Sequence, residues 1–131
     1  MAEDYLIDTS AVIKYLNGTL PDNGLLFIDE IVDRKSCVSF VSEIELQVWN
    51  PTNPEDLEVY QAFITNSTVV GISPAIVSET IRIRKDFKVK LPDAIIAATA
   101  LINGWVLIAD NDKDFKKIIG LKYINPRMLA I

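Results

Sequence analysis

Four places in the sequence carry acidic side chains next to an apolar run. Asp8 follows the apolar residues of "DYLI", Glu45 comes shortly after "CVSFV", and Asp93 stands directly before "AIIAATA". A further cluster, "DNDKD" at residues 110–114, follows "WVLI". Carboxylates gathered at one place repel each other unless a cation holds them together, and oxygen ligands select hard ions such as Mg²⁺ or Mn²⁺. A bound ion of this kind can activate water and stabilise charge in phosphoryl chemistry.

Taken singly, each acid also has a structural explanation. Asp93 follows Pro92 at the start of a helical pattern, where a negative charge interacts favourably with the helix dipole by about 0.3–1 kcal/mol. Glu45 stands three residues after Ser42, which is the spacing of a capping box. Asp8 could be a turn residue, and "DNDKD" could be an ordinary strand-to-helix loop. Only the convergence of several acids would favour a metal site over these explanations.

Residues that the sequence lacks exclude several other kinds of site. It contains no histidine and one cysteine, Cys37, so disulfides, zinc sites and imidazole-assisted catalysis are excluded within this chain. No apolar run reaches the roughly 18–20 residues of a membrane span, and the amino-terminal "MAEDYLID" is acidic where a signal peptide is basic. We therefore expect a soluble, cytoplasmic protein without a membrane partner.

The charge is distributed unevenly along the chain. The net charge is −5, but residues 1–81 carry 13 acidic and 3 basic side chains, whereas residues 82–131 carry 5 acidic and 10 basic ones. The segment "RIRKDFKVK" brings Arg82, Arg84 and Lys85 close to Asp93. A solvated helix face would explain this run, but beside a metal site it would also hold the phosphates of a nucleic acid strand.

The elements that must position these residues alternate along the chain. Apolar runs at 4–8, 37–41, 67–72, 105–110 and 122–125 predict strands, and amphipathic or apolar segments between them predict helices. Continuously apolar strands that alternate with helices are typical of an α/β fold with a mainly parallel sheet of four or five strands, covered on both faces. In such a sheet ligands bind outside the carboxyl ends of the strands, where Asp8, Glu45 and residues 110–114 would meet. We expect residues 1–131 to form a single domain.

Four motifs together resemble a known family. "LIDTSAVI", "SFVSEIEL", "KLPDAIIAATAL" and "LIADNDKDF" are similar, in order and spacing, to the PIN domain, and specifically to the VapC-type toxin ribonucleases. The resemblance implies a three-layer α/β/α fold, cleavage of single-stranded RNA dependent on Mg²⁺ or Mn²⁺, frequent homodimers and inhibition by a cognate antitoxin. It places the family's metal-binding acids at Asp8, Glu45 and Asp93. It also implies that Thr9 or Ser10 supports the site by hydrogen bonding.

The sequence departs from the family at the fourth site position. Family members usually carry Thr two residues before an acid or Asn, and the matching residues here are Ala109 and Asn111. Asn111 is therefore a candidate catalytic residue, and either Asp110 or Asp112 could replace it as a metal ligand. The missing hydroxyl also leaves a second hypothesis open, that of a catalytically silent PIN module which binds RNA or a protein partner.

Overall fold

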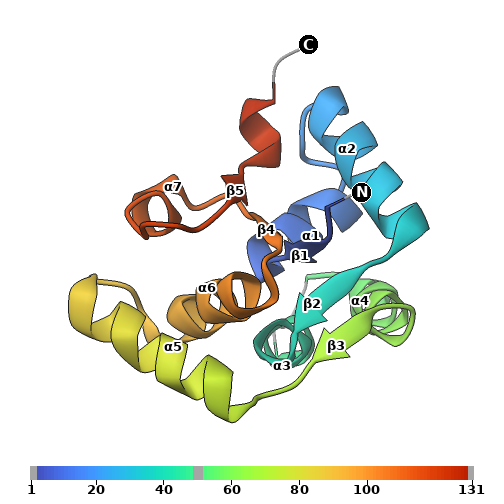
Figure 1. Ribbon diagram of the computed structural model, residues 1–131. Coiled ribbons are helices and arrows are strands. Elements are labelled where there is room, and N and C mark those ends of the chain that lie inside the picture. Colours follow the sequence, from blue (N-terminus) through green and yellow to red (C-terminus); the bar gives the residue numbers. More distant parts are fainter. Residues whose placement is uncertain (1–2, 49–51, 130–131) are drawn as a thin grey trace.

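The computed structural model describes residues 3–48 and 52–129 (Figure 1). Strands and helices alternate along these residues as the sequence predicts. In chain order the elements are β1 (Tyr5–Ile7), α1 (Thr9–Leu16), α2 (Asp22–Arg34), β2 (Cys37–Ser39), α3 (Phe40–Val48), α4 (Glu55–Thr65), β3 (Thr68–Val70), α5 (Pro74–Asp86), α6 (Leu91–Asn103), β4 (Val106–Ile108), α7 (Asp112–Phe115), β5 (Tyr123–Ile124) and the 3₁₀ helix η1 (Pro126–Met128).

All strand pairings among the described residues are parallel. β4 lies between β1 and β5, with Leu6 opposite Leu107 and Ile108 opposite Ile124. β2 and β3 form a separate two-stranded ladder, and β1 packs beside β2. Every strand is only two or three residues long, so few hydrogen bonds hold the sheet and side-chain packing supplies most of its stability.

Alternate residues of the strands belong to two hydrophobic cores. Leu6 and Leu107 pack into one core together with apolar residues of α5, α6 and α7. Ile7 and Ile108 point the opposite way, into a core shared with α1, α2, α3 and α4. Because successive side chains of a strand point to opposite faces, the two cores lie on opposite sides of the sheet. The predicted α/β class and the three-layer α/β/α arrangement are confirmed.

The connections bring the ends of three chain segments to one edge of the sheet. Asp8 directly follows β1 and caps α1, and α3 begins directly after β2. The helix α6 leads into β4 and ends at Gly104, whose φ of +69° is the left-handed conformation that glycine favours. A helix that feeds the amino end of a parallel strand starts at the opposite edge, so the amino terminus of α6 lies near the carboxyl ends of the strands.

The predicted capping role of Ser42 differs from the structure. The second strand ends at Ser39, and Phe40 already belongs to α3, so Ser42 lies inside that helix and cannot be its cap. The predicted end of this helix before Pro51 lies outside the described residues.

The sequence also makes the apolar helical segments 25–32 and 57–64 candidates for the face of a homodimer. The structure turns Ile28 and Ile31 of α2, and Tyr60 and Phe63 of α4, into the second core. Their exposed apolar side chains include Leu26 and Val59. A homodimer therefore stays a prediction. None of the helices in the described ranges has the length and continuous apolar sequence needed to cross a bilayer.

Replacing Gly24 by alanine tests how closely η1 packs on α2. A Cβ atom at Gly24 would overlap the backbone carbonyl oxygen of Pro126, which cannot move aside like a side chain. Alanine favours a helix by about 1 kcal/mol over glycine, but overpacking typically costs about 1–3 kcal/mol. Because the overlapping atom belongs to the backbone, the cost lies in the upper part of this range, and we expect Gly24→Ala to lower the stability by about 1–2 kcal/mol, or roughly 4–8 °C in Tm by calorimetry.

The matched control is Gly71→Ala, where an added Cβ meets no atom within 4 Å and φ is not positive. Its Tm should stay close to that of the unchanged protein. An unaltered Tm for Gly24→Ala would contradict the close approach of η1 to α2.

Candidate functional site

A cavity of about 500 Å³ opens at the carboxyl edge of the sheet. Its walls come from the β1–α1 junction, α3, the amino terminus of α6 and the loop after β4. The residues that line it are Asp8, Thr9, Ser10, Ile13, Glu45, Val48, Asp93, Asp110 and Asn111. The three acids predicted from separate parts of the sequence, Asp8, Glu45 and Asp93, therefore share one cavity.

Asp8 is a buried carboxylate at the amino end of α1. It is 5 % exposed, and its Oδ2 accepts hydrogen bonds from the Ser10 hydroxyl at 2.7 Å and the Ser10 backbone N–H at 3.3 Å. Burial nevertheless raises the pKa of Asp8 above its ordinary value, with a smaller contribution from the charge of Glu45. Asp8 is thus both a helix cap and a poorly solvated negative charge, and capping alone does not remove the energetic cost of its burial.

Glu45 is held by the hydroxyl of Thr9. The Thr9 Oγ1 donates to Glu45 Oε1 at 2.6 Å and lies 2.9 Å from the buried hydroxyl of Ser42. These contacts replace the predicted capping box, because Ser42 faces Thr9 of α1 instead of the start of its own helix. Thr9 and Ser10 thus each hydrogen-bond to an acid of the cavity, as expected for residues that support the site.

Asp93 shows the mutual repulsion of the acids most clearly. Burial, followed by the negative charges of Asp8, Asp114 and Glu45, raises the pKa of Asp93 to about 6, although Lys90 opposes the shift. Its place in the first turn of α6 does not offset these effects. A group with such a perturbed pKa inside a cavity is a candidate for function.

These three acids lack an ion-pair partner among the described residues. Within residues 3–48 and 52–129, Asp8, Glu45 and Asp93 form no ion pair with lysine or arginine. In the same ranges no three acidic side chains already stand at metal-ligand distance from one point. The oxygen-only donor set and its uncompensated charge fit a hard divalent cation, but binding one requires the side chains to turn toward it.

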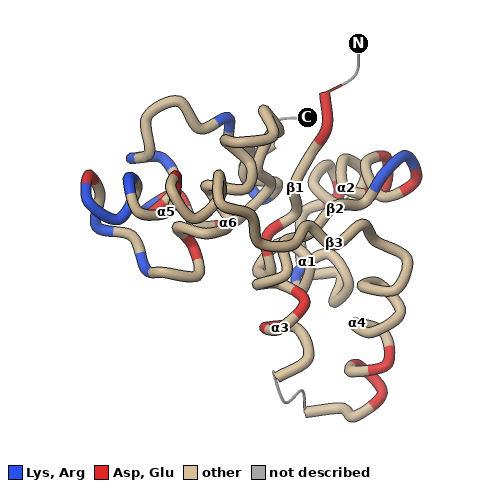
Figure 2. Tube along the Cα trace, turned by 60° about the horizontal axis from the view of Figure 1, so that its bottom comes forward, with Lys and Arg blue, Asp and Glu red and all other residues tan. Residues whose placement is uncertain are grey.

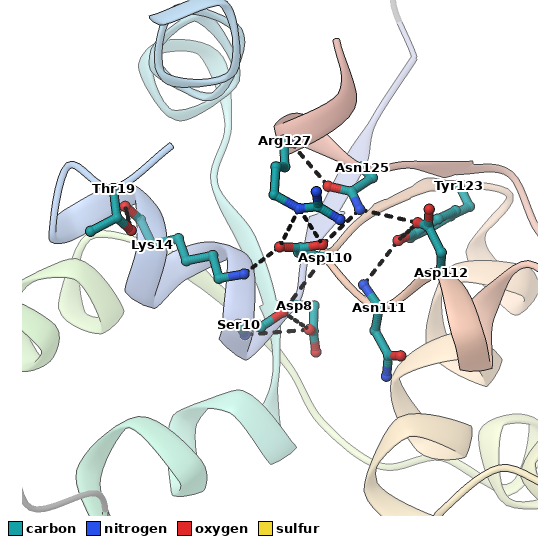
Figure 3. Close-up of polar contacts among 10 residues, drawn as sticks. All are labelled: Asp8, Ser10, Lys14, Thr19, Asp110, Asn111, Asp112, Tyr123, Asn125 and Arg127. Carbon is teal, nitrogen blue, oxygen red and sulfur yellow. Dashed lines mark hydrogen bonds and ion pairs between the residues drawn. The ribbon is translucent and has the colours of Figure 1, made fainter. Parts of the chain in front are cut away.

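The acids in the loop after β4 have different partners. Figure 3 shows the carboxylate of Asp110 turned toward Lys14 and Arg127. Asp110 also accepts a hydrogen bond from the Asn125 side chain at 2.7 Å. Burial opposes ionisation of Asp110, but these partners together lower its pKa below the ordinary value. Asp110 lines the cavity, yet its charge is already balanced by residues of α1 and η1.

Asp112 does not line the cavity. Its Oδ1 accepts hydrogen bonds from the Tyr123 hydroxyl at 2.7 Å and from Asn125 at 3.0 Å, and Lys116 lies 3.5 Å from its other oxygen. The hydrogen bond from Tyr123 is the main reason that the pKa of Asp112 is lowered. The structure therefore gives both Asp110 and Asp112, the two acids proposed as the fourth metal ligand, partners of their own.

Asn111, the third candidate for the fourth site position, lies beside Asp114. Asn111 lines the cavity and caps α7, where its Nδ2 donates to Asp114 Oδ2 at 3.1 Å and its Oδ1 accepts from the Asp114 N–H at 3.4 Å. Asp114 is close enough to raise the pKa of Asp93. The sequence-based prediction missed Asp114. Its position three residues after a helix-capping Asn was the available signal, since capping places these two side chains together.

The three predicted RNA-binding residues lie in different surroundings. Arg82 pairs with Glu79 and lies 3.6 Å from Asp86, so its charge is shared with acids of α5. Arg84 lines a second cavity, which adjoins the first. Lys85 lines neither of the two cavities and is exposed. Of the three, Arg84 alone faces the region beside Asp93.

Comparisons of the sequence and of the structure with known proteins agree with one another. The PIN domain family matches residues 5–121. A toxin–antitoxin complex from Klebsiella pneumoniae is 25 % identical over 94 % of this chain and 98 % of that chain, with a TM-score of 0.73. VapBC from Salmonella typhimurium, solved bound to DNA, is 22 % identical over 95 % of this chain and 99 % of that chain, with a TM-score of 0.78. VapBC-1 from nontypeable Haemophilus influenzae is 21 % identical over 93 % of this chain and 97 % of that chain, with a TM-score of 0.76. No curated protein matches the chain.

Proposed function

The chain belongs to the PIN domain family, and from that premise we propose that it is a metal-dependent endoribonuclease that cleaves single-stranded RNA as the toxin of a toxin–antitoxin pair. The likeness to the Klebsiella pneumoniae toxin–antitoxin complex, over nearly the full length of both chains, supports the second half of the proposal. Such a toxin would act in the cytoplasm and would have a cognate antitoxin as its partner. A homodimer is part of the same proposal.

One observation supports the chemistry more than any other. Asp8, Glu45 and Asp93 line a single cavity and form no ion pair with a basic residue in the described part of the chain. Burial and the charges of the neighbouring acids raise the pKa of Asp8 and of Asp93. A fold that brings such charges together without a counter-ion loses stability by doing so. A bound Mg²⁺ or Mn²⁺ removes that cost and supplies an activated water and charge stabilisation at a phosphodiester.

The residues around the cavity would have separate tasks. Ser10 fixes the carboxylate of Asp8 and Thr9 fixes that of Glu45, so two acids are held by hydroxyl groups of the same helical turn. Asp93 and Asn111 line the same cavity, and Asn111 hydrogen-bonds to Asp114. Holding ligands in place by a second layer of hydrogen bonds typically changes metal affinity or activity by 10–100-fold.

The second candidate function is a catalytically silent module, and Ala109 favours it. Ala109 is fully buried and offers no hydroxyl where the resemblance leads us to expect one. Asp110, beside it, is neutralised by Lys14 and Arg127. Both features leave fewer groups at this wall of the cavity that are free to hold a cation.

Two measurements on the unchanged protein separate these functions. A labelled single-stranded RNA is incubated with the protein in Mn²⁺ or in EDTA, and Mn²⁺ binding is measured by calorimetry. Cleavage in Mn²⁺ alone supports the ribonuclease. Binding of Mn²⁺ without cleavage of any of several RNA sequences favours the silent module, and no binding of Mn²⁺ rejects the metal site itself.

A further inference from the structure

A second cavity, of about 790 Å³, adjoins the acidic one. Asp93 and Asn111 line both cavities, so the two meet at the side of the proposed metal site. Five basic side chains stand around the second cavity together with Val89 and Asp114: Arg84, Lys88, Lys90, Lys113 and Lys117. We call this cavity with its five basic residues the basic groove.

The basic groove is built from two segments that are distant in sequence. Arg84 lies near the end of α5, and Lys88 and Lys90 lie in the connection to α6. Lys113 belongs to α7 and Lys117 follows it, and the Lys117 Nζ donates to the backbone carbonyl of Lys88 at 2.5 Å. That hydrogen bond links the two segments, which form the two walls of the basic groove. In Figure 2 lysine and arginine gather around the end of α5, whereas acidic residues predominate on α3 and α4.

Most of the positive charge in the basic groove has no ion-pair partner in the part of the chain that the structure describes. Among the described residues, Arg84, Lys88, Lys90 and Lys113 form no ion pair, and Lys117 pairs at 3.6 Å with Asp114. Arg82, by contrast, pairs with acids of its own helix. Unpaired cations that surround a concave site create a positive field, and such a field attracts a polyanion.

The lining of the basic groove also indicates which part of a nucleic acid it contacts. Within the described ranges it includes no aromatic side chain on which a base could stack, and its one apolar residue is Val89. Non-specific single-strand binding that relies on the bases uses aromatic stacking, whereas contacts to phosphates need only positive charge. The basic groove is therefore suited to the backbone and not to the bases.

We infer that the basic groove holds the phosphates of single-stranded RNA on one side of the bond that the acidic cavity cleaves. This inference rests on the proposed function, because that function supplies the RNA. The groove directs the strand past Asp93 and Asn111 into the cavity and contributes affinity that does not depend on base sequence. Arg84, Lys88, Lys90, Lys113 and Lys117 then replace Arg82 and Lys85 as the principal RNA-binding residues.

The test compares two double variants that lose the same charge. Lys88→Gln with Lys113→Gln removes one cation from each wall of the basic groove, and Lys85→Gln with Lys122→Gln removes two cations that line neither cavity. Binding of a fluorescent 12-nucleotide single-stranded RNA is measured by anisotropy in EDTA, over a range of salt concentrations. EDTA prevents cleavage, so the measurement does not require an active enzyme.

We expect the groove variant to bind RNA roughly 10–100-fold more weakly at low salt. The slope of log affinity against log salt concentration should become shallower by about 1.4, because each of the two lost phosphate contacts on a single strand contributes about 0.7 to it. The control variant should bind like the unchanged protein, and different RNA sequences should lose affinity equally. Circular dichroism checks that both variants are folded. If the groove double variant does not fold, the single variants Lys88→Gln and Lys113→Gln are measured in its place.

Equal loss of affinity in both double variants would overturn the basic groove as a specific site. Tighter binding of an acidic peptide than of RNA with the same number of charges would also overturn it, in favour of a protein ligand. If the groove effect is present but Mn²⁺ supports no cleavage, the proposed ribonuclease activity fails and the groove stands. If Mn²⁺-dependent cleavage is present and the groove variant cleaves long RNA at the normal kcat/KM, the groove fails and the ribonuclease stands.

Discussion

Asp8→Asn is expected to abolish Mn²⁺-supported RNA cleavage while leaving the metal-free protein at least as stable as the unchanged one. Asparagine can still accept the two hydrogen bonds from Ser10 and remains a good helix cap, so α1 should keep its start. The substitution removes a negative charge whose burial raises the pKa of Asp8. Loss of outer hydrogen bonds to metal ligands costs 10–100-fold in activity, so loss of a direct ligand should exceed about 100-fold.

The opposite sign of the stability change would identify Asp8 as a structural residue. If Asp8 served only as a cap that asparagine could not replace, the variant would lose about 0.5–2 kcal/mol and keep its activity. Cleavage of a labelled single-stranded RNA and the Tm in EDTA measure the two effects. Asp33→Asn, an equal loss of charge at an exposed position of α2, is the matched control and should alter neither.

Mn²⁺ should raise the Tm of the unchanged protein strongly at pH 7.5 and much less at pH 5. A ligand at 100 times its Kd stabilises the folded state by about 2.7 kcal/mol, which for a chain of this length corresponds to roughly 10 °C. The proton competes with the ion for Asp93, whose pKa is raised to about 6 mainly by burial and by the charges of Asp8, Asp114 and Glu45. Metal binding should therefore strengthen as the pH rises through 6.

The metal-free protein should show the reverse dependence. The folded state keeps the proton of Asp93 up to a pH of about 6, whereas the unfolded chain releases it near the ordinary pKa of an aspartate, 3.8. Folding therefore takes up a proton between these values, and the contribution of Asp93 to stability falls as the pH rises from about 4 to above 6. Asp8, whose pKa is also raised, acts in the same direction.

Asp93→Asn is the variant that checks both effects by differential scanning calorimetry at several pH values. It should flatten the fall in metal-free stability between pH 4 and 7 and largely remove the Mn²⁺-induced rise in Tm. Asp86→Asn, at the exposed end of α5, is the matched control and should keep both. A full Mn²⁺ shift in Asp93→Asn would show that the ion binds elsewhere.

The order of the elements could be predicted from local patterns because each pattern depends on neighbouring residues. Apolar runs predicted the five strands found among the described residues, and the helical pattern that starts at Pro92 begins within one residue of the start of α6. Since parallel strands share a carboxyl edge, the pattern also brought Asp8, Glu45 and Asp93 to one side. The capping role of Ser42 failed because Phe40 already belongs to α3, and tertiary contact with Thr9 uses the hydroxyl instead.

By itself the sequence determined the fold class, the family and the edge at which three acids meet, since these follow from periodicity and from the order of the motifs. The tertiary structure decided which partners surround each acid of residues 110–114. Lys14 and Arg127 reach Asp110 across 96 and 17 residues of chain, and Tyr123 reaches Asp112, while Asp114 turns toward Asn111 and Asp93. Coulomb interactions depend on distance through space, and neighbouring acids in one loop acquire different surroundings once distant segments fold against them.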